Sequence, residues 1–376
     1  MRLWPLRRRR AAVLSADSTA FTVAELGPQL TGVLTVDQVR IEGHAVAFGG
    51  RLLVNPATAV TELVARFRAF GYTPFVQAGQ EGLTWVRALP FVDVQVPSRP
   101  RTNIVLFLLT VLSTLVAGSG AFFTFNPIFE PRRLLEGIPF SFTLLAILGT
   151  HEFGHYFTAR AYGASVSLPY FIPAPPPLLF GTLGAIIRMR SPARDRNSLF
   201  DIAAAGPLAG LVVALPALWI GLRWSKVGAV PAGGSVAFGD SLLLRFMTWL
   251  SFGTLPPGHD VFVHPVALAG WVGLFVTALN LIPVGQLDGG RIAYALFGAR
   301  HRQISIATFV ALLALGAVTG AGNWFVWAFL LLFVMGFHHQ PPLDDVSPLS
   351  PGRYAVGVLC LLLLIILIPP VPIAIQ

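Results

Sequence analysis

The chain has little charge and almost no lysine or cysteine. Only 11% of its 376 residues are charged, about half the fraction usual in soluble globular domains, whereas 55% are hydrophobic. This balance excludes an ordinary soluble protein and predicts a polytopic membrane protein. Cys360 is the only cysteine, which excludes an intrachain disulfide and a thiolate metal site. A bound metal ion would therefore need histidine and carboxylate ligands.

The few charges are mostly positive. The formal net charge is +9, and arginine supplies nearly all of the excess because Lys226 is the only lysine. A basic excess can indicate nucleic-acid binding, but in a membrane protein it more often marks the cytoplasmic loops. We therefore expect a lipid bilayer and no nucleic acid among the partners. No feature of the sequence indicates the oligomeric state.

Residues 1–100 are predicted to form a small α+β domain. The segment 44–54 has strand character, and Asn55 followed by Pro56 predicts a helix that ends at Gly71. Two further strands are expected at 72–77 and 83–89. We expect this domain to bind a partner or to act as a regulatory module.

Long apolar runs fill the rest of the chain, residues 101–376. Spanning the hydrocarbon core takes about 20 residues. The runs lie at 102–125, 136–162, 199–223, 264–297, 303–320, 322–337 and 352–374. The sequence thus predicts a polytopic α-helical membrane protein with about seven transmembrane helices and the α+β domain at its amino terminus.

The arginines of the short loops predict the orientation in the membrane. Most of them lie on the same side as residues 1–100, and positively charged loops are usually cytoplasmic. The amino-terminal domain is therefore expected in the cytoplasm. The second span then runs inward, which places its carboxyl end towards the cytoplasmic leaflet.

The sequence HEFGH, residues 151–155, lies near the end of this second span. His151 and His155 are four residues apart, so on a helix both imidazoles project from one face and can reach one ion. With Glu152 beside the first ligand, this is the H-E-x-x-H arrangement of zinc hydrolases. Two histidines on a helix are often ordinary packing residues, but unpartnered polar groups inside a membrane are costly.

A third ligand is expected elsewhere in the membrane, since catalytic zinc usually takes three protein ligands. Asp288 is the only carboxylate in the 264–297 run. Pro283 and the glycines around Asp288 interrupt the helix, which allows a carboxylate to face an interior cavity. The alternative is that Asp288 pairs with the nearby Arg291.

The two motifs together resemble the site-2 protease family of intramembrane zinc metalloproteases. HEFGH is followed by NLIPVGQLDGGR at 280–291, and the resemblance, closest to the branch with plastid and bacterial proteins, covers roughly residues 100–350. It implies one zinc ion per chain, held by His151, His155 and Asp288, with Glu152 as the general base. It also implies that Asn280 contacts the substrate, although Asn280 could equally make a helix–helix hydrogen bond.

The function implied is that of an intramembrane endopeptidase acting in regulated intramembrane proteolysis. A transmembrane helix of a substrate protein would be cut by a water molecule that zinc and Glu152 activate. The alternative from another class is a catalytically silent scaffold or chaperone of the same fold. A silent member should have lost part of the motif, and all four key residues are present.

Two further segments have expected roles. Residues 203–210, AAAGPLAG, have small residues at a spacing that allows close helix packing, which we expect against the catalytic spans. Residues 181–187, including Gly181 and Gly184, are expected to form a strand or hairpin. Its edge could hold an unwound substrate by backbone pairing, or the segment could be a surface loop that covers the helices.

Overall fold

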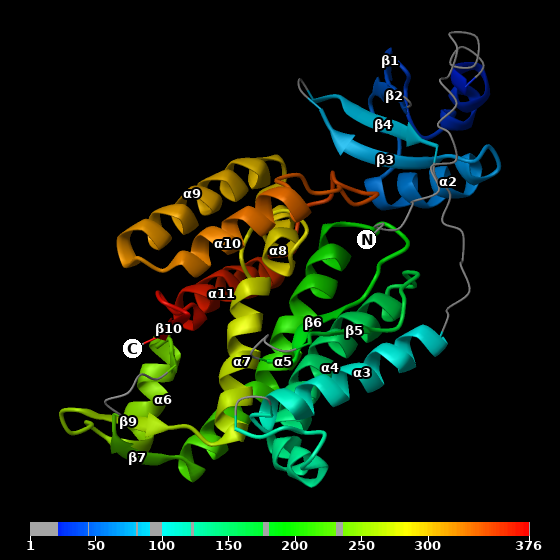
Figure 1. Cartoon of the computed structure of the whole chain (residues 1–376). Coiled ribbons are helices and arrows are strands. Elements are labelled where there is room, and N and C mark those ends of the chain that lie inside the picture. The colour runs from blue at the N-terminus through cyan, green and yellow to red at the C-terminus, as the bar shows by residue number, and fades with distance from the viewer. Residues whose placement is uncertain are drawn as a thin grey trace. The chain divides into compact units, whose positions relative to one another are not determined.

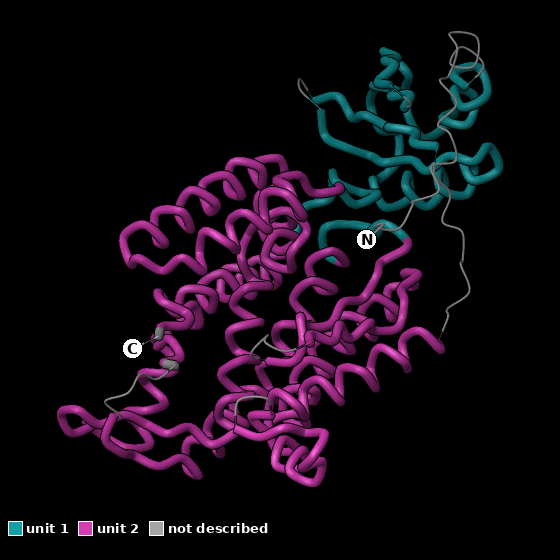
Figure 2. The backbone as a smooth tube through the Cα atoms, viewed as in Figure 1, with its two compact units in different colours: residues 1–95, 191–197, 341–349 teal, residues 96–190, 198–340, 350–376 magenta. Residues whose placement is uncertain are grey.

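The computed structural model describes residues 22–43, 45–79, 82–90, 100–121, 124–175, 180–230 and 236–375 (Figure 1). The chain divides into two compact units. Unit 1 comprises residues 1–95 with the short segments 191–197 and 341–349, and unit 2 comprises the remaining residues (Figure 2).

Unit 1 is a four-stranded antiparallel sheet with one long helix. The strand order is β1-β2-β4-β3. The Asn55 side chain caps the helix by accepting a hydrogen bond from the Thr58 backbone N–H at 2.9 Å. The elements are the 3₁₀ helix η1 (Gly27–Leu30), β1 (Gln38–Glu42), β2 (Ala45–Gly50), α2 (Pro56–Arg68), β3 (Thr73–Ala78) and β4 (Thr84–Leu89).

The sheet of unit 1 is extended by two segments from distant parts of the chain. Val76 of β3 accepts a hydrogen bond from the Asp345 N–H at 2.9 Å and donates one to the Leu343 carbonyl at 2.7 Å. Leu343 in turn donates to the Ala193 carbonyl at 3.0 Å, and Arg196 pairs with Asp345 at 2.9 Å. Leu343 also packs against the core of this unit, so residues 1–95 alone do not complete it.

Unit 2 is built mainly from apolar helices. Among the described residues, four helical stretches are long and apolar enough to cross a membrane: Pro100–Gly118, Pro131–Ala161, Arg196–Trp224 and Asp288–Thr319. The helices are α3 (Pro100–Gly118), η3 (Pro131–Gly137), α4 (Ile138–Ala161), α5 (Arg196–Trp224), α6 (Leu242–Phe252), α7 (Pro265–Asn280), α8 (Asp288–Phe297), η4 (Gly298–Arg300), α9 (His301–Thr319), α10 (Gly322–Leu330), the π-helix η5 (Leu331–Met335) and α11 (Pro351–Leu367).

Three short antiparallel strand pairs connect these helices. They are β5 (Tyr170–Pro173) with β6 (Thr182–Ile186), β7 (Lys226–Ala229) with β9 (His259–Phe262), and β8 (Val236–Phe238) with β10 (Ile373–Ile375). The core between the helices is aromatic and aliphatic, with Phe140 of α4, Trp271 of α7 and Trp324 of α10 buried together. The large apolar side chains and long helices agree with a membrane-embedded unit.

The predicted elements of the amino-terminal domain agree with the structure except in two places. The helix predicted to end at Gly71 ends earlier, at Arg68, and Phe70 beyond it is exposed. Strand β1 was not predicted, because all five of its residues are exposed and it lacks the alternation of a half-buried strand.

Candidate metal centre

Helix α4 presents the H-E-x-x-H motif to the interior of unit 2. His151, Glu152 and His155 are all buried, although the helix is otherwise dominated by apolar residues. Because positions i and i+4 lie on one face of a helix, the two imidazoles stand one turn apart. Their rings meet edge to face with centroids 4.9 Å apart.

Asp288 reaches the same place from a break between two helices. Helix α7 ends at Asn280, and α8 begins at Asp288. The turn between them is tight because a Cβ atom on Gly289 would lie 1.9 Å from the Leu281 carbonyl oxygen, so only glycine fits there. This break directs the Asp288 carboxylate towards the histidines of α4, 133 residues away in sequence from His155.

The three side chains converge at one point. His155 Nε2 lies 3.2 Å from both His151 Nε2 and Asp288 Oδ2, and His151 Nε2 lies 3.4 Å from the same oxygen. Tetrahedral zinc with bonds of about 2.0–2.2 Å would separate its ligands by roughly 3.3–3.5 Å. The donor set and the spacing therefore fit one zinc ion, and the salt bridges of Asp288 run to these histidines.

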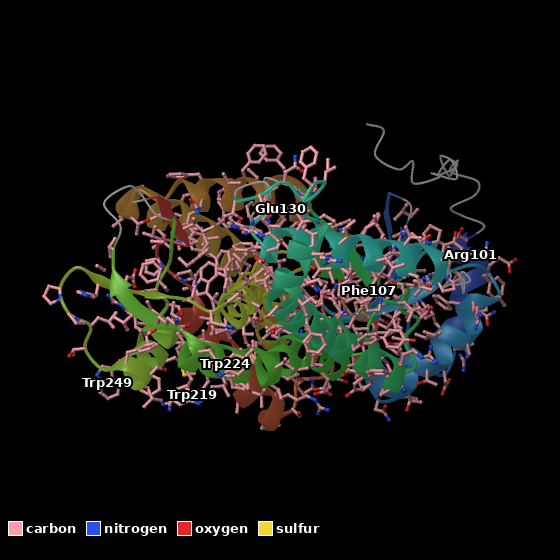
Figure 3. All side chains as sticks on the ribbon, turned by 60° about the horizontal axis from the view of Figure 1, so that its bottom comes forward. Arg101, Phe107, Glu130, Trp219, Trp224 and Trp249 are labelled. Atoms are coloured by element: carbon pink, nitrogen blue, oxygen red, sulfur yellow. The ribbon has the colours of Figure 1, made fainter. Side chains whose placement is uncertain are left out.

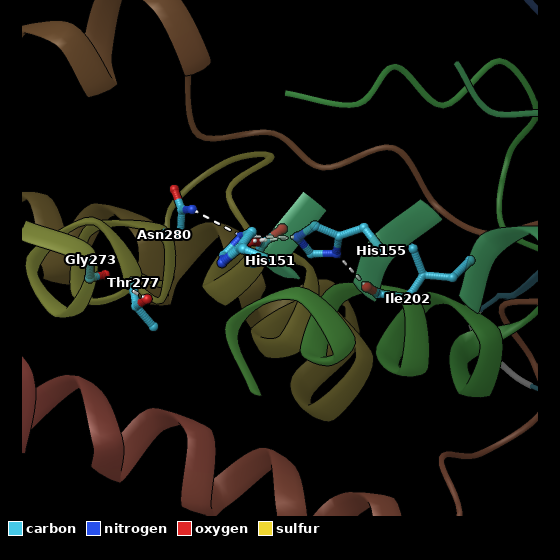
Figure 4. Close-up of polar contacts among 7 residues, drawn as sticks. His151, His155, Ile202, Gly273, Thr277 and Asn280 are labelled. Carbon is cyan, nitrogen blue, oxygen red and sulfur yellow. Dashed lines mark hydrogen bonds and ion pairs between the residues drawn. The ribbon is translucent and has the colours of Figure 1, made fainter. Parts of the chain in front are cut away.

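A backbone carbonyl fixes the orientation of His155. Its Nδ1 lies 2.6 Å from the Ile202 carbonyl oxygen of α5, where it donates the hydrogen bond (Figure 4). With the proton on Nδ1, the lone pair of Nε2 points to the place where the three ligand atoms meet. Metal-binding histidines are commonly held by such a second hydrogen bond. A carbonyl in an apolar stretch of sequence gives no signal of this role.

Glycines allow α5 to pack closely on the histidine face of α4. A Cβ atom on Gly206 would lie 2.1 Å from His155 Nε2, and one on Gly210 would lie 3.3 Å from the Cβ of His151. From the other side, a Cβ on Gly154 would lie 2.6 Å from the Ala205 carbonyl oxygen. The predicted packing of residues 203–210 against the catalytic helix is confirmed.

Asn280, the last residue of α7, lies beside the first histidine. Its Nδ2 is 3.2 Å from His151 Nε2 (Figure 4). The Asn280 side chain thus lies at the edge of the ligand cluster. This contact joins α7 to α4, as the expected helix–helix hydrogen bond would.

Glu152 lies between the ligand cluster and the β5–β6 hairpin. The backbone of Ile187, directly after β6, hydrogen-bonds to the Glu152 carboxylate. Residues 182–186 form the strand that was expected at 181–187, and in the described part of the chain they pair only with β5. Gly181 has φ +67° and a Cβ there would lie 2.3 Å from the Ser113 carbonyl oxygen, whereas Gly184 has φ +96° and open space beside it.

A third buried histidine supports the turn that carries Asp288. Ser305 Oγ lies 3.2 Å from His301 Nε2 and donates to the Pro283 carbonyl at 3.1 Å. Ser305 and His301 are both buried on α9. The sequence left His301 without a role because an isolated histidine has no spacing to interpret; only the packing of α9 on the turn reveals one.

Comparison with known proteins identifies the family of the domain that contains these residues. Residues 139–321, which contain the three candidate ligands, match Peptidase family M50. The chain therefore contains a peptidase family M50 domain. The expected relation to site-2 proteases is confirmed. No solved structure matches the chain.

Several plant proteins are similar over most of this chain. The probable zinc metalloprotease EGY1, chloroplastic, of Oryza sativa subsp. japonica is 32% identical over 295 residues, 71% of this chain and 50% of that protein. The probable zinc metalloprotease EGY2, chloroplastic, of Arabidopsis thaliana is 31% identical over 251 residues, 65% of this chain and 44% of that protein. The chain thus spans about half the length of these relatives.

The close approach of α5 to the histidines generates a test. We expect Gly206→Ala to displace His155 and to weaken zinc binding about 10- to 100-fold, as for other residues that orient a metal ligand. Gly210→Ala should have a smaller effect because its nearest contact is 3.3 Å. Zinc per chain, measured by mass spectrometry after dialysis against a weak chelator, checks this.

The matched control is Gly149→Ala on α4, the helix that carries the histidines, where the nearest atom to a new Cβ is 4.0 Å away. It should bind zinc like the natural chain. Normal zinc affinity in Gly206→Ala would contradict the assigned geometry.

Proposed function

We propose that this protein is an intramembrane zinc endopeptidase that cuts transmembrane segments of other proteins. The observation that carries the proposal is the meeting of His151, His155 and Asp288 within 3.4 Å of one another, with Glu152 buried beside them. Zinc would be held by these three side chains, one ion per chain. The names of the plant relatives, probable zinc metalloproteases, support the same activity.

When bound, zinc supplies Lewis-acid polarisation of the scissile carbonyl and lowers the pKa of water. Glu152 takes a proton from the attacking water and passes it to the nitrogen of the departing peptide. Asn280 donates its amide N–H to the carbonyl oxygen of the substrate, where negative charge develops. Ile202 holds His155 in the tautomer that these steps need.

Strand β6 is proposed to bind the unwound substrate. Its free edge in the described structure offers backbone groups for strand addition, and Leu183 of β6 is 67% exposed. The next residue after the strand, Ile187, contacts Glu152. The hairpin itself turns at Gly181 and Gly184. A peptide paired with β6 would therefore run towards the general base, Glu152.

Seven spans and a cytoplasmic amino-terminal domain are proposed from the chain connections. Unit 1 gathers residues 1–95, 191–197 and 341–349, so these lie on one side of the membrane. The β8–β10 pair gathers 236–238 and 373–375 on the other side. Helices α3 and α4 cross the membrane and return, and α5 then crosses to the other side. Three spans lead back: α7 with α8, then α9, then α10, and α11 crosses last. In this count the apolar stretch Asp288–Thr319 is divided between two spans at η4. Together with the arginine-rich loops, it supports an active site towards the cytoplasmic leaflet.

The amino-terminal domain is proposed to regulate the protease. Its sheet includes residues 193–195 and 343–345, which lead directly into α5 and α11. The first turns of these helices are joined by the Asp201–Arg353 ion pair at 2.8 Å. Ile202, the next residue of α5, orients His155. A partner that shifts the sheet would therefore move the start of α5. Through Ile202 this movement would change the orientation of His155.

A cleavage assay tests the activity. Natural protein and variants are reconstituted in vesicles with a membrane protein that has one transmembrane helix. Glu152→Gln should retain zinc but lose about 10²- to 10⁴-fold in rate, the usual contribution of a general base. Glu136→Gln, at an exposed glutamate, is the control. Zinc-loaded natural protein that cuts no such substrate would favour the silent scaffold instead.

Two further variants in the same assay separate the roles of the hairpin and the domain. Leu183→Ser should raise KM without lowering kcat, and an unchanged KM would exclude β6 from substrate binding.

Asp344→Ala removes a buried carboxylate that accepts from the Val346 and Ser347 backbone N–H groups at 3.0 Å. It should change kcat with zinc content constant; unaltered kinetics would contradict regulation through the sheet.

The orientation is tested by labelling single cysteines in a Cys360→Ala background. A membrane-impermeant maleimide added to intact bacterial cells should label His259→Cys, in the 225–264 connection, but not Arg68→Cys on α2. Both positions are exposed. The reverse pattern would show that the domain lies outside the cytoplasm.

A further inference from the structure

Helix α6 has an apolar side that nothing in the described structure covers. None of its eleven residues is buried. Leu242, Phe246, Trp249 and Leu250 are 57%, 55%, 58% and 50% exposed. Their spacing of i, i+4, i+7 and i+8 places them on one side of the helix. On the inner side Leu244 packs against the core of unit 2. Trp249, at one margin of the apolar side, also lines a cavity that it shares with Trp271 of α7. Leu242, Phe246 and Leu250 therefore face outward.

This helix is too short to cross a membrane and has defined ends. Eleven residues extend about 16 Å, roughly half of the hydrocarbon thickness. At its start the Ser241 hydroxyl accepts a hydrogen bond from the Leu244 N–H at 3.2 Å. At its end Gly253 adopts φ +71°, which stops the helix. The exposed side therefore belongs to a complete short helix and is no fragment of a span.

The chain connections place α6 at a membrane surface. It lies in residues 225–264, between the end of α5 at Trp224 and the start of α7 at Pro265. Because α5 is long enough to span, its end is at the boundary of the bilayer. The Trp271 indole of α7 donates to the Gly239 carbonyl at 3.0 Å, which ties the segment before α6 to the helix bundle. The segment that carries α6 is thus held at the end of the helix bundle where α5 ends.

Tryptophan side chains gather at this end of the helix bundle. Trp219 and Trp224 of α5 and Trp249 of α6 lie together at one end of unit 2, while Arg101 at the start of α3 lies at the other (Figure 3). Trp224 and Trp249 are each 58% exposed. Tryptophan is enriched where the acyl chains meet the head groups, because its ring is apolar and its N–H needs a polar partner.

We propose that α6 is an interfacial helix that lies in the head-group region of the leaflet where α5 ends. Its partner is the phospholipid bilayer itself. Phe246 and Trp249 enter the boundary of the acyl chains. Arg245, whose side chain is 71% exposed and 3.9 Å from Asp240, stands at the margin of the apolar side, where a guanidinium can reach the phosphates. This inference does not depend on the proposed protease activity.

The immersion depth of α6 tests the proposal in the full chain. Cys360 is the only cysteine and is buried, so Cys360→Ala gives a background for single spin labels. Labels replace Phe246 and Trp249 in protein reconstituted into phosphatidylcholine and phosphatidylglycerol vesicles. Collision with oxygen, which is apolar, and with a water-soluble nickel complex then measures depth.

Two control positions define the limits of the scale. Val310, 56% exposed in the middle of α9, represents the hydrocarbon core, and the exposed His259 represents water. Labels at 246 and 249 should lie between these limits, about 5–10 Å below the phosphates. Depth equal to that at His259 would overturn the proposal.

Two other outcomes would also overturn the proposal, because each would show that protein, and not lipid, covers the apolar side of α6. Labels at 246 and 249 that neither reagent reaches would mean that another polypeptide covers α6. Magnetic broadening between labels at 249, abolished by dilution with unlabelled protein, would mean that a second copy covers it. Both differ from the interfacial result, in which oxygen reaches the labels and no broadening occurs.

Discussion

Two imidazoles and a carboxylate meet inside a group of apolar helices, and the surrounding structure is arranged to keep them together. Polar side chains at membrane depth are unfavourable unless they have partners. His151 and His155 are separated by one turn of α4, but Asp288 must come from another helix. The break between α7 and α8 brings it there. Glycine at positions 206 and 289 is required because a side chain would occupy the space of a ligand or of the turn.

Hydrogen bonds from outside the ligand set then fix the orientation of these groups. The Ile202 carbonyl holds the ring of His155, and Ser305 holds the turn before Asp288 through the Pro283 carbonyl. Both contacts are buried, where hydrogen bonds gain strength from the low dielectric. The metal centre therefore depends on α5 and α9 as well as on the helices that carry the ligands.

The sequence predicted the features that local chemistry determines. The Asn55 cap, the i, i+4 pair of histidines and the glycine-rich break at Asp288 each have a residue pattern with a physical cause. Contacts that depend on long-range packing had no such pattern. The Ile202 carbonyl could be any backbone group, the bridges at Asp344 involve a single residue, and β1 is wholly exposed. Helix α6 was not predicted because its apolar stretch of eleven residues is too short for a span.

Zinc stoichiometry in detergent-purified protein tests the central claim most directly. Natural protein is compared with Asp288→Ala and with Asp260→Ala, which removes an exposed carboxylate. The account predicts about one zinc per chain in the natural protein and the control, and a loss of most of it in Asp288→Ala. Natural protein without zinc would contradict a metal centre, and zinc retained by Asp288→Ala would contradict the ligand set.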